Sequence, residues 1–188
     1  RVPASFNNLL GYKPTRGKLS NRGIVPACRS LDCVSVFGLQ VTDIAEILSV
    51  LEKWDPLDPF SRKVEKPISC CLSETPKVAL LSDDQLDFFG DSMAQKAYEK
   101  SVDVLAKSGL DLDSVDLSPF LEAADLLYSG PWVAERHLAT SPLIKESPDS
   151  FLPETRRIIS GGSDPSAREA FLAQYKLAEL RREADKIW

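Results

Sequence analysis

Apolar residues recur at intervals of three and four in three stretches of the chain, at about 42–54, 92–107 and 164–188. This spacing places them on one face of a helix, so each stretch predicts an amphipathic helix. Thr42 is the predicted N-cap of the first helix, and Gly109 follows the end of the second. The apolar stripe of the last helix consists of Ala170, Ala173, Leu177, Leu180, Ala184 and Trp188.

Short apolar runs flank the second of these helices. The runs 77–81 and 114–117 predict strands, and a strand, a helix and a strand within about forty residues predict a βαβ unit with two parallel strands. Residues 1–40 are punctuated by Gly and Pro, so we expect turns with short strands there, at 23–26 and 33–38. The predicted fold class is therefore α/β.

Proline and glycine divide the rest of the chain. Ser118-Pro119 predicts a helix start, with Ser118 as the cap, and this helix ends at Gly130-Pro131. A further helical piece is predicted from Trp132 to about residue 140. Several prolines predict loops at 55–75 and 141–163.

Charge and composition exclude several classes of function. The chain has 188 residues, a net charge of −5 and a pI near 5.0, which argues against binding to nucleic acid or to an anionic membrane. It contains no apolar run long enough to predict a transmembrane helix. The four cysteines, Cys28, Cys33, Cys70 and Cys71, match no zinc-binding spacing, so we expect reduced thiols and no metal site.

The first seventeen residues carry a motif. Arg1-Val-Pro-Ala, followed by Gly11-Tyr-Lys-Pro-Thr, resembles the second half of the amidase-signature motif of serine amidohydrolases. The resemblance implies a mixed β-sheet core flanked by helices, of which residues 1–188 would be the C-terminal portion of one domain, truncated at both ends. In this family the nucleophilic Ser lies two residues before the arginine, and it works with a second Ser and a Lys. The resemblance thus places no catalytic residue in this chain, and we expect the 188 residues alone to be inactive.

A narrower resemblance is to the allophanate hydrolases within that family. It is carried by three segments, 16–36, 127–136 and 175–182. It implies hydrolysis of allophanate with release of ammonia in urea or cyanuric-acid catabolism, without a metal or organic cofactor. It also implies a cytoplasmic homodimer that is fused to, or works with, biotin-dependent urea carboxylase.

The same resemblance makes Tyr128 and Arg136 the candidate substrate-binding residues. Allophanate is an anion, and a guanidinium offers two parallel N–H donors that match its carboxylate. A tyrosine hydroxyl can donate a further hydrogen bond. The residue pattern alone favours a different interpretation, in which Tyr128 is a core aromatic residue and Arg136 is a surface or capping cation.

Two further residues are candidates for structural roles. Arg1 follows the expected nucleophile loop and is predicted to hold it, and Asp32 is predicted to accept from a cation such as Arg1 or from backbone amides. Two alternatives to an allophanate hydrolase stay open. One is another amidase, such as the A subunit of an amidotransferase, and the other is a non-catalytic segment that supplies walls of a substrate pocket.

Overall fold

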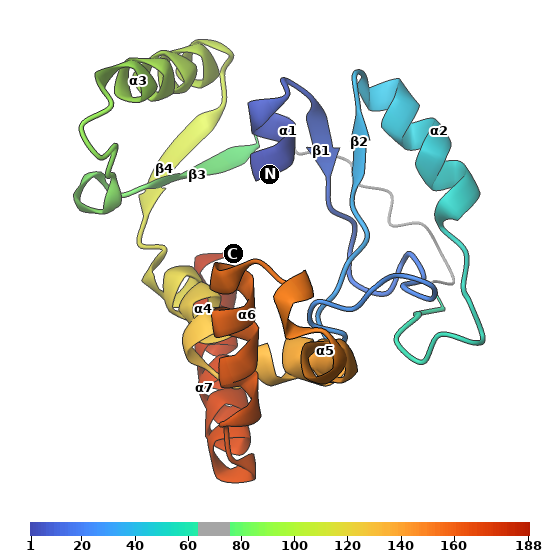
Figure 1. The fold of residues 1–188 in the computed structure, drawn as a ribbon. Coiled ribbons are helices and arrows are strands. Elements are labelled where there is room, and N and C mark those ends of the chain that lie inside the picture. The colour runs from blue at the N-terminus through green and yellow to red at the C-terminus, as the bar shows by residue number, and fades with distance from the viewer. Residues whose placement is uncertain (64–75) are drawn as a thin grey trace. The chain divides into compact units, whose positions relative to one another are not determined.

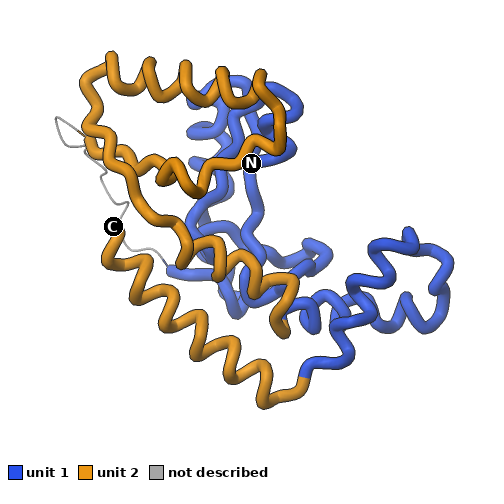
Figure 2. Tube along the Cα trace, turned by 90° about the vertical axis from the view of Figure 1, so that its left-hand side faces the viewer, with its two compact units in different colours: residues 1–68, 132–165 blue, residues 69–131, 166–188 orange. Residues whose placement is uncertain are grey.

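The computed structural model describes residues 1–63 and 76–188, so the predicted loop at 55–75 is described only in part, and Cys70 and Cys71 lie outside the described residues. The chain forms two compact units (Figure 2). Unit 1 comprises residues 1–68 and 132–165, and unit 2 comprises residues 69–131 and 166–188. Each unit thus combines segments that are distant in the sequence. No helix among the described residues is both long and apolar enough to cross a membrane.

The N-terminal part of unit 1 is a short antiparallel sheet with a helix beside it (Figure 1). Strand β1 (Leu10–Tyr12) pairs with β2 (Val36–Gly38), and helix α2 (Val41–Leu51) packs on β2. One cluster of buried apolar side chains joins these elements because the inward positions of strand and helix meet there. Its members are Leu19, Val36 and Ile44, with Tyr12, Val34 and Leu48 against them.

Several predictions for this part need correction. Residues 2–6 form a short helix, α1 (Val2–Phe6), which the sequence did not indicate. The segment 23–26 is a turn, in which Gly23 has a φ of +83°, and not a strand. Thr42 lies inside α2, because Gln40 keeps an extended backbone and its N–H donates to Asp43 Oδ2 at 2.9 Å. Gln40 is therefore the N-cap.

The second part of unit 1 is helical where loops were predicted. Helix α5 (Val133–Glu146) runs through Pro142 and beyond the predicted end, and α6 (Pro153–Ser160) follows it. Two 3-10 turns, η2 (Pro148–Ser150) and η3 (Gly161–Ser163), flank α6. The prediction of loops at 141–163 was wrong because Pro148 and Pro153 sit in the first turns of helical segments, where a missing N–H does no harm.

Unit 2 contains the predicted βαβ unit, which is confirmed. Strand β3 (Lys77–Leu81) pairs in parallel with β4 (Asp111–Val115), and α3 (Ser92–Lys107) connects them after a 3-10 turn, η1 (Asp83–Gln85). Helix α3 begins where Asp91 accepts hydrogen bonds from the N–H groups of Met93 and Ala94. Strand β4 starts three residues before the predicted one, because its pairing with β3 extends back to Asp111, which lies opposite Lys77.

Two helices complete unit 2. Helix α4 (Ser118–Ser129) packs against α7 (Ala167–Ile187), and the Phe120 ring meets the Trp188 ring edge-on at 6.4 Å between centroids. Ser118 is the first residue of α4 and not its cap, which is Leu117. Helix α7 begins at Ala167, later than predicted, because Ser166 caps it through a reciprocal pair of hydrogen bonds with Glu169.

Candidate functional site

The first turn of α5, which carries Arg136, is bonded to a loop at residues 26–33 of the same unit. The Glu135 carboxylate accepts a hydrogen bond from the Ser30 N–H at 2.7 Å and another from the Ser30 hydroxyl. The two residues are 105 positions apart in the sequence. The Cys28 Sγ also lies 3.7 Å from the carbonyl oxygen of Trp132, the residue before α5. The helix start is thus tied to the loop by side chains and not by a β-ladder.

Asp32 gives the loop its own shape. Its carboxylate accepts hydrogen bonds from the N–H groups of Ala27 at 3.0 Å and Cys28 at 2.9 Å. Arg16 Nη1 donates to the Ser30 carbonyl oxygen at 2.8 Å from outside the loop. The prediction that Asp32 accepts from backbone amides agrees with these contacts, whereas its place near a nucleophile loop stays a prediction.

The pKa of the Cys28 thiol reflects its burial and the charges around it. It is only 4% exposed. Burial, followed by the nearby carboxylates of Glu135 and Asp32, raises the pKa of the Cys28 thiol from 9.0 to about 11, although the charge of Arg136 acts in the lowering direction. Cys28 is therefore a protonated, weakly reactive thiol near neutral pH, as expected for a structural cysteine.

The two predicted substrate-binding residues belong to different units. Arg136 is half-buried on the first turn of α5 in unit 1, within electrostatic reach of Cys28. Tyr128 is 61% exposed on the last turn of α4 in unit 2. The predicted break between them is confirmed: Gly130 ends α4 with an extended backbone (φ −99°, ψ −171°). Both side chains make interactions, and their joint action on a substrate stays a prediction.

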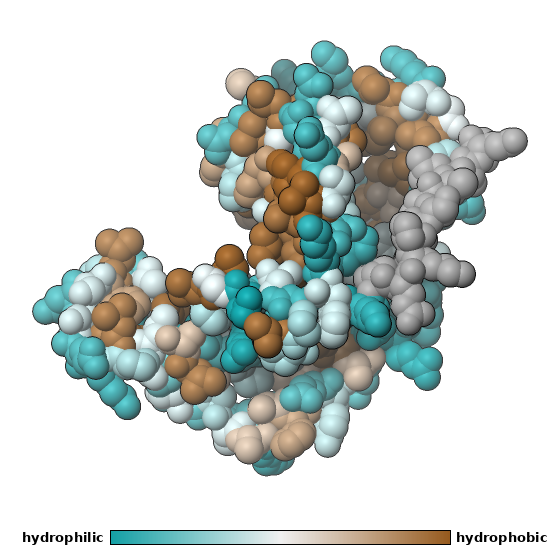
Figure 3. All heavy atoms as spheres, turned by 90° about the vertical axis from the view of Figure 1, so that its right-hand side faces the viewer, coloured by the Kyte–Doolittle hydropathy of each residue, from teal (hydrophilic) through white to brown (hydrophobic). Residues whose placement is uncertain are grey.

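Beside the Glu135–Ser30 contact lies a surface groove of about 590 Å³ in unit 1. Apolar side chains form most of its wall, and Arg29 lies over the Phe60 ring at 5.7 Å from its centroid. The lining residues are Pro26, Arg29, Ser30, Pro59, Phe60, Glu135, Leu138 and Ala139. Exposed apolar residues are also found elsewhere, and Figure 3 shows them interspersed with polar ones on one face.

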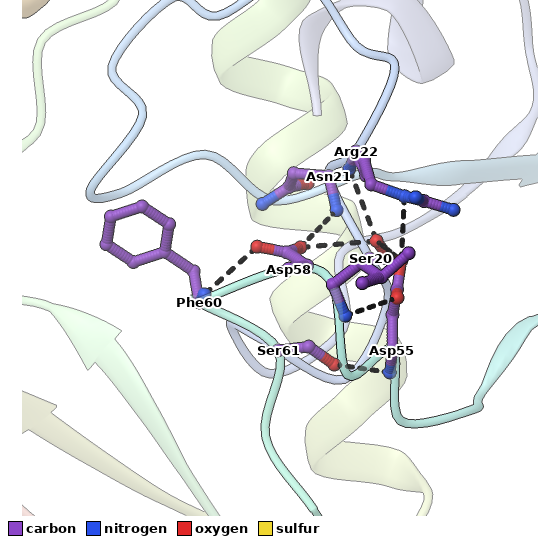
Figure 4. Close-up of polar contacts among 8 residues, drawn as sticks. Ser20, Asn21, Arg22, Asp55, Asp58, Phe60 and Ser61 are labelled. Carbon is purple, nitrogen blue, oxygen red and sulfur yellow. Dashed lines mark hydrogen bonds and ion pairs between the residues drawn. The ribbon is translucent and has the colours of Figure 1, made fainter.

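A second polar cluster of unit 1 lies around Asp55 and Asp58 (Figure 4), and the sequence reasoning missed it. Asp58 is 8% exposed and accepts from the N–H groups of Asn21 at 2.8 Å and Phe60 at 2.9 Å and from the Ser20 hydroxyl at 3.2 Å. Those backbone N–H donors hold the pKa of the Asp58 carboxyl below its ordinary value. The cluster is therefore built around an ionised carboxylate.

Asp55 is the second carboxylate of the same cluster. It accepts from the Leu57 N–H and the Ser20 hydroxyl and forms an ion pair with Arg22 Nε at 3.3 Å. The Leu57 N–H, followed by the Ser20 hydroxyl, lowers the pKa of Asp55. Both aspartates bond an N–H two residues on, which is an Asx turn, so the two Asp-Pro pairs were the signal that could have predicted the cluster. Within the described residues, no group of His, Cys, Asp and Glu side chains could hold a metal ion.

Comparison with known proteins identifies the family of this chain. The Amidase family matches residues 1–188, which is the whole chain. This chain belongs to the amidase family. The predicted amidase-signature resemblance is thus confirmed.

Comparison with individual proteins shows which members of the amidase family this chain is similar to. It is 35% identical to the urea amidolyase of Saccharomyces cerevisiae over 100% of the chain, and 35% identical to that of Lachancea kluyveri over 99%. It spans only 10% of the length of each of these proteins. The A subunit of a glutamyl-tRNA(Gln) amidotransferase from Caldanaerobacter subterraneus is 33% identical over 66% of the chain and 26% of its own length.

Solved structures give the same result for the fold. The amidase chain superposes on Kluyveromyces lactis allophanate hydrolase with a TM-score of 0.90 and 42% identity, over 98% of this chain and 30% of that one. The urea amidolyase of the same organism gives a TM-score of 0.91 and 41% identity, over 98% and 11%. The predicted α/β amidase-signature fold is therefore confirmed.

Arg1 is exposed and precedes α1, and its predicted contact with a nucleophile loop stays a prediction. We assign no catalytic residue among the described residues. What the observed arrangement provides is a cation, Arg136, on a helix start that the 26–33 loop holds in place.

Proposed function

We propose that this amidase chain is part of an enzyme that hydrolyses allophanate. The observation that carries the proposal is its likeness, at 41–42% identity over essentially the whole chain, to solved structures of an allophanate hydrolase and a urea amidolyase. A chain that matches the corresponding part of such enzymes from end to end shares their local architecture, including the elements that carry Arg136 and Tyr128.

In this proposal Arg136 binds the substrate carboxylate and Tyr128 orients it. A guanidinium stays charged at all working pH values and can donate two parallel hydrogen bonds to a carboxylate. Arg136 lies on the first turn of α5, and its neighbour Glu135 is hydrogen-bonded to Ser30. This hydrogen bond gives Arg136 a rigid support. The exposed Tyr128 offers a hydroxyl that can donate to the same ligand.

The chemistry follows from the family mechanism. In that mechanism a serine attacks the carbonyl carbon of the ureido group, the C–N bond breaks and ammonia leaves. Water then releases the carboxylated product from the acyl-enzyme. Arg136 and Tyr128 contribute by holding the anion so that this carbonyl faces the nucleophile.

Substitution of Arg136 tests the proposal in a complete amidase polypeptide that carries these residues. We expect Arg136→Ala to lower kcat/KM for allophanate by roughly 30- to 5,000-fold, since loss of a buried charge pair costs about 2–5 kcal/mol. Arg157→Ala, on the exposed surface of α6, is the matched control and should change kcat/KM less than twofold. An Arg136→Ala enzyme with unchanged kcat/KM contradicts the role of Arg136. A wild-type enzyme without allophanate activity contradicts the proposed function.

The second candidate is another amidase of the family, which the likeness to the A subunit of an amidotransferase favours. An enzyme of that kind would release ammonia from glutamine. Ammonia assays with allophanate and glutamine, each on the same wild-type preparation, separate the two candidates because only one substrate should be consumed.

We further propose, from the resemblance to urea amidolyases, that the complete protein is a cytoplasmic homodimer that is fused to, or works with, a biotin-dependent urea carboxylase. The likeness of this chain to two urea amidolyases supports the association with the carboxylase. Intact mass under denaturing conditions tests the fusion, and sedimentation of the native protein tests the dimer.

A further inference from the structure

Helix α5 has no side-chain cap of its own at its start. Its N-cap is Trp132, which cannot accept a hydrogen bond from the first helical N–H groups. An uncapped helix start frays unless tertiary contacts fix it. The backbone position of Arg136, the fourth residue of α5, therefore depends on the contacts that hold this turn.

Two contacts hold the turn from opposite sides. On one side Glu135 accepts both hydrogen bonds of Ser30. On the other, η3 approaches so closely that a Cβ on Gly162 would lie 2.8 Å from the Cβ of His137 and would overlap the Val133 carbonyl oxygen. Because successive residues of a helix are about 100° apart, Glu135 points away from the face formed by Val133 and His137.

We propose that Glu135 is a positioning residue for Arg136: its carboxylate anchors the first turn of α5 to Ser30 and so fixes the direction of the Cα–Cβ bond from which the neighbouring guanidinium extends. The helix turn is rigid between positions 135 and 136, so anchoring one side chain sets the rotation of the other about the helix axis. A shift of about 1 Å in a substrate-binding group is enough to weaken binding strongly.

The carboxylate suits this task for a chemical reason. Glu135 has two acceptor oxygens, and Ser30 supplies two donors, a backbone N–H and a hydroxyl, so the pair is fully matched. The Ser30 carbonyl oxygen is held in turn by Arg16 Nη1 at 2.8 Å. The anchor is thus tied to a loop that is itself fixed, and not to a freely moving residue.

This inference rests on the proposed function of Arg136, and a double-mutant cycle separates the two. In the complete amidase polypeptide we expect Glu135→Ala to raise KM for allophanate about tenfold with kcat within threefold. Glu135→Gln, which keeps one acceptor oxygen, should stay within threefold in KM. In an Arg136→Ala background, Glu135→Ala should change KM less than twofold, because the group it positions is already gone. Glu146→Ala, an exposed acid at the end of α5, is the matched control and should have no effect.

A purely structural role would give a different result. Glu135→Ala would then lower activity by the same factor with and without Arg136, and that outcome overturns the inference, as does an unchanged KM in Glu135→Ala. If Glu135→Ala does not fold, Ser30→Ala removes one of the two donors and should raise KM about threefold, again only when Arg136 is present. If Arg136→Ala itself leaves KM unchanged, the proposed role of Arg136 fails. Hydrogen exchange over residues 133–140, faster in Glu135→Ala than in wild type, still decides whether the anchor exists.

Discussion

Units 1 and 2 are stabilised by different kinds of contact. Unit 2 is built from regular elements: a parallel strand pair with Val78 opposite Leu112, the helix between the strands, and two helices packed together. In unit 1, side chains bond to backbone groups that are distant in sequence, as Asp58 does with Asn21 and Glu135 with Ser30. Regular elements therefore make up most of unit 2, whereas in unit 1 carboxylates hold the loops beside the apolar cluster of Leu19, Val36 and Ile44.

This difference predicts which substitutions should reduce the stability of each unit. In unit 1, removal of one carboxylate leaves several donors without a partner, and a buried unsatisfied donor carries its full desolvation penalty. In unit 2, the capping side chains of Asp91 and Ser166 each serve one helix end, so loss of either should have a smaller, local effect. Substitutions in both units test this contrast, from the largest expected effect to the smallest.

Asp58→Ala should have the largest effect on stability. It removes the acceptor of the Asn21 and Phe60 N–H groups, and we expect a loss of about 2–4 kcal/mol in the free energy of unfolding of unit 1. Urea unfolding, with hydrogen exchange over residues 20–22 and 58–61, measures it. Asp149→Ala removes a fully exposed carboxylate and should change stability by less than about 0.5 kcal/mol. Equal losses in both variants, which both lie in unit 1, would show that the donors collected by Asp58 do not carry the effect.

The same carboxylate makes unit 1 sensitive to acid. The pKa of Asp58 is lower in the folded chain than its ordinary value, so its stabilisation is present above the unfolded-state pKa near 4. As the pH falls through the folded pKa, the carboxylate becomes protonated and the stabilisation is lost. Wild type should therefore lose more stability on acidification than Asp58→Ala does.

Cys28 should make unit 1 sensitive to alkali. The unfolded thiol ionises near 9.0 and the folded thiol near 11, so the folded chain binds more protons between these values and its stability falls as the pH rises. The expected loss is on the order of 2–3 kcal/mol across this window. Urea midpoints at several pH values measure it as the difference between wild type and Cys28→Ala. A difference that is flat from pH 9 to 11 would contradict the burial of this thiol.

Gly162→Ala tests the close approach of η3 to α5. The added methyl group would overlap the Val133 carbonyl oxygen and crowd His137, so we expect a loss of about 1–3 kcal/mol and faster hydrogen exchange in α5. Gly161→Ala in the same turn is the control, because a Cβ there would meet nothing within 4 Å. If both variants behave alike, the packing of η3 on α5 does not fix that helix.

Ser166→Ala should have the smallest effect and tests unit 2. Ser166 caps α7 by accepting from the Glu169 N–H, and loss of such a cap costs about 1 kcal/mol, with faster exchange confined to the first turn of α7. Ser101→Ala, in the middle of α3, should be neutral, since alanine is the better helix former. An effect of Ser166→Ala as large as that of Asp58→Ala would show that unit 2 also depends on individual polar contacts.

The elements that the sequence predicted correctly lie mostly in unit 2, and those that it missed lie mostly in unit 1. Strand β3, helix α3 with its terminal Gly109 and the parallel pairing were predicted, because their apolar spacing and end signals are local. The second half of α5, which continues through Pro142, and all of α6 were missed because prolines suggested loops there. A proline in a first turn, as at the start of α6, and one at a chain break look alike in sequence. The Asp55–Asp58 cluster was missed although its two Asp-Pro pairs carried an Asx-turn signal.

The sequence by itself determined the α/β class, the family motif at residues 1–17 and the choice of Tyr128 and Arg136 as candidates. The class depends on residue types at short spacing, which a one-dimensional pattern contains, whereas the motif and the two candidates rest on the resemblance to a known family. Only the tertiary structure decided that Glu135 meets Ser30 across 105 positions, that Asp58 collects donors from residues 20 and 21, and that Tyr128 and Arg136 lie in different units. Contacts between distant residues depend on how the chain returns to itself, and no local spacing records that path.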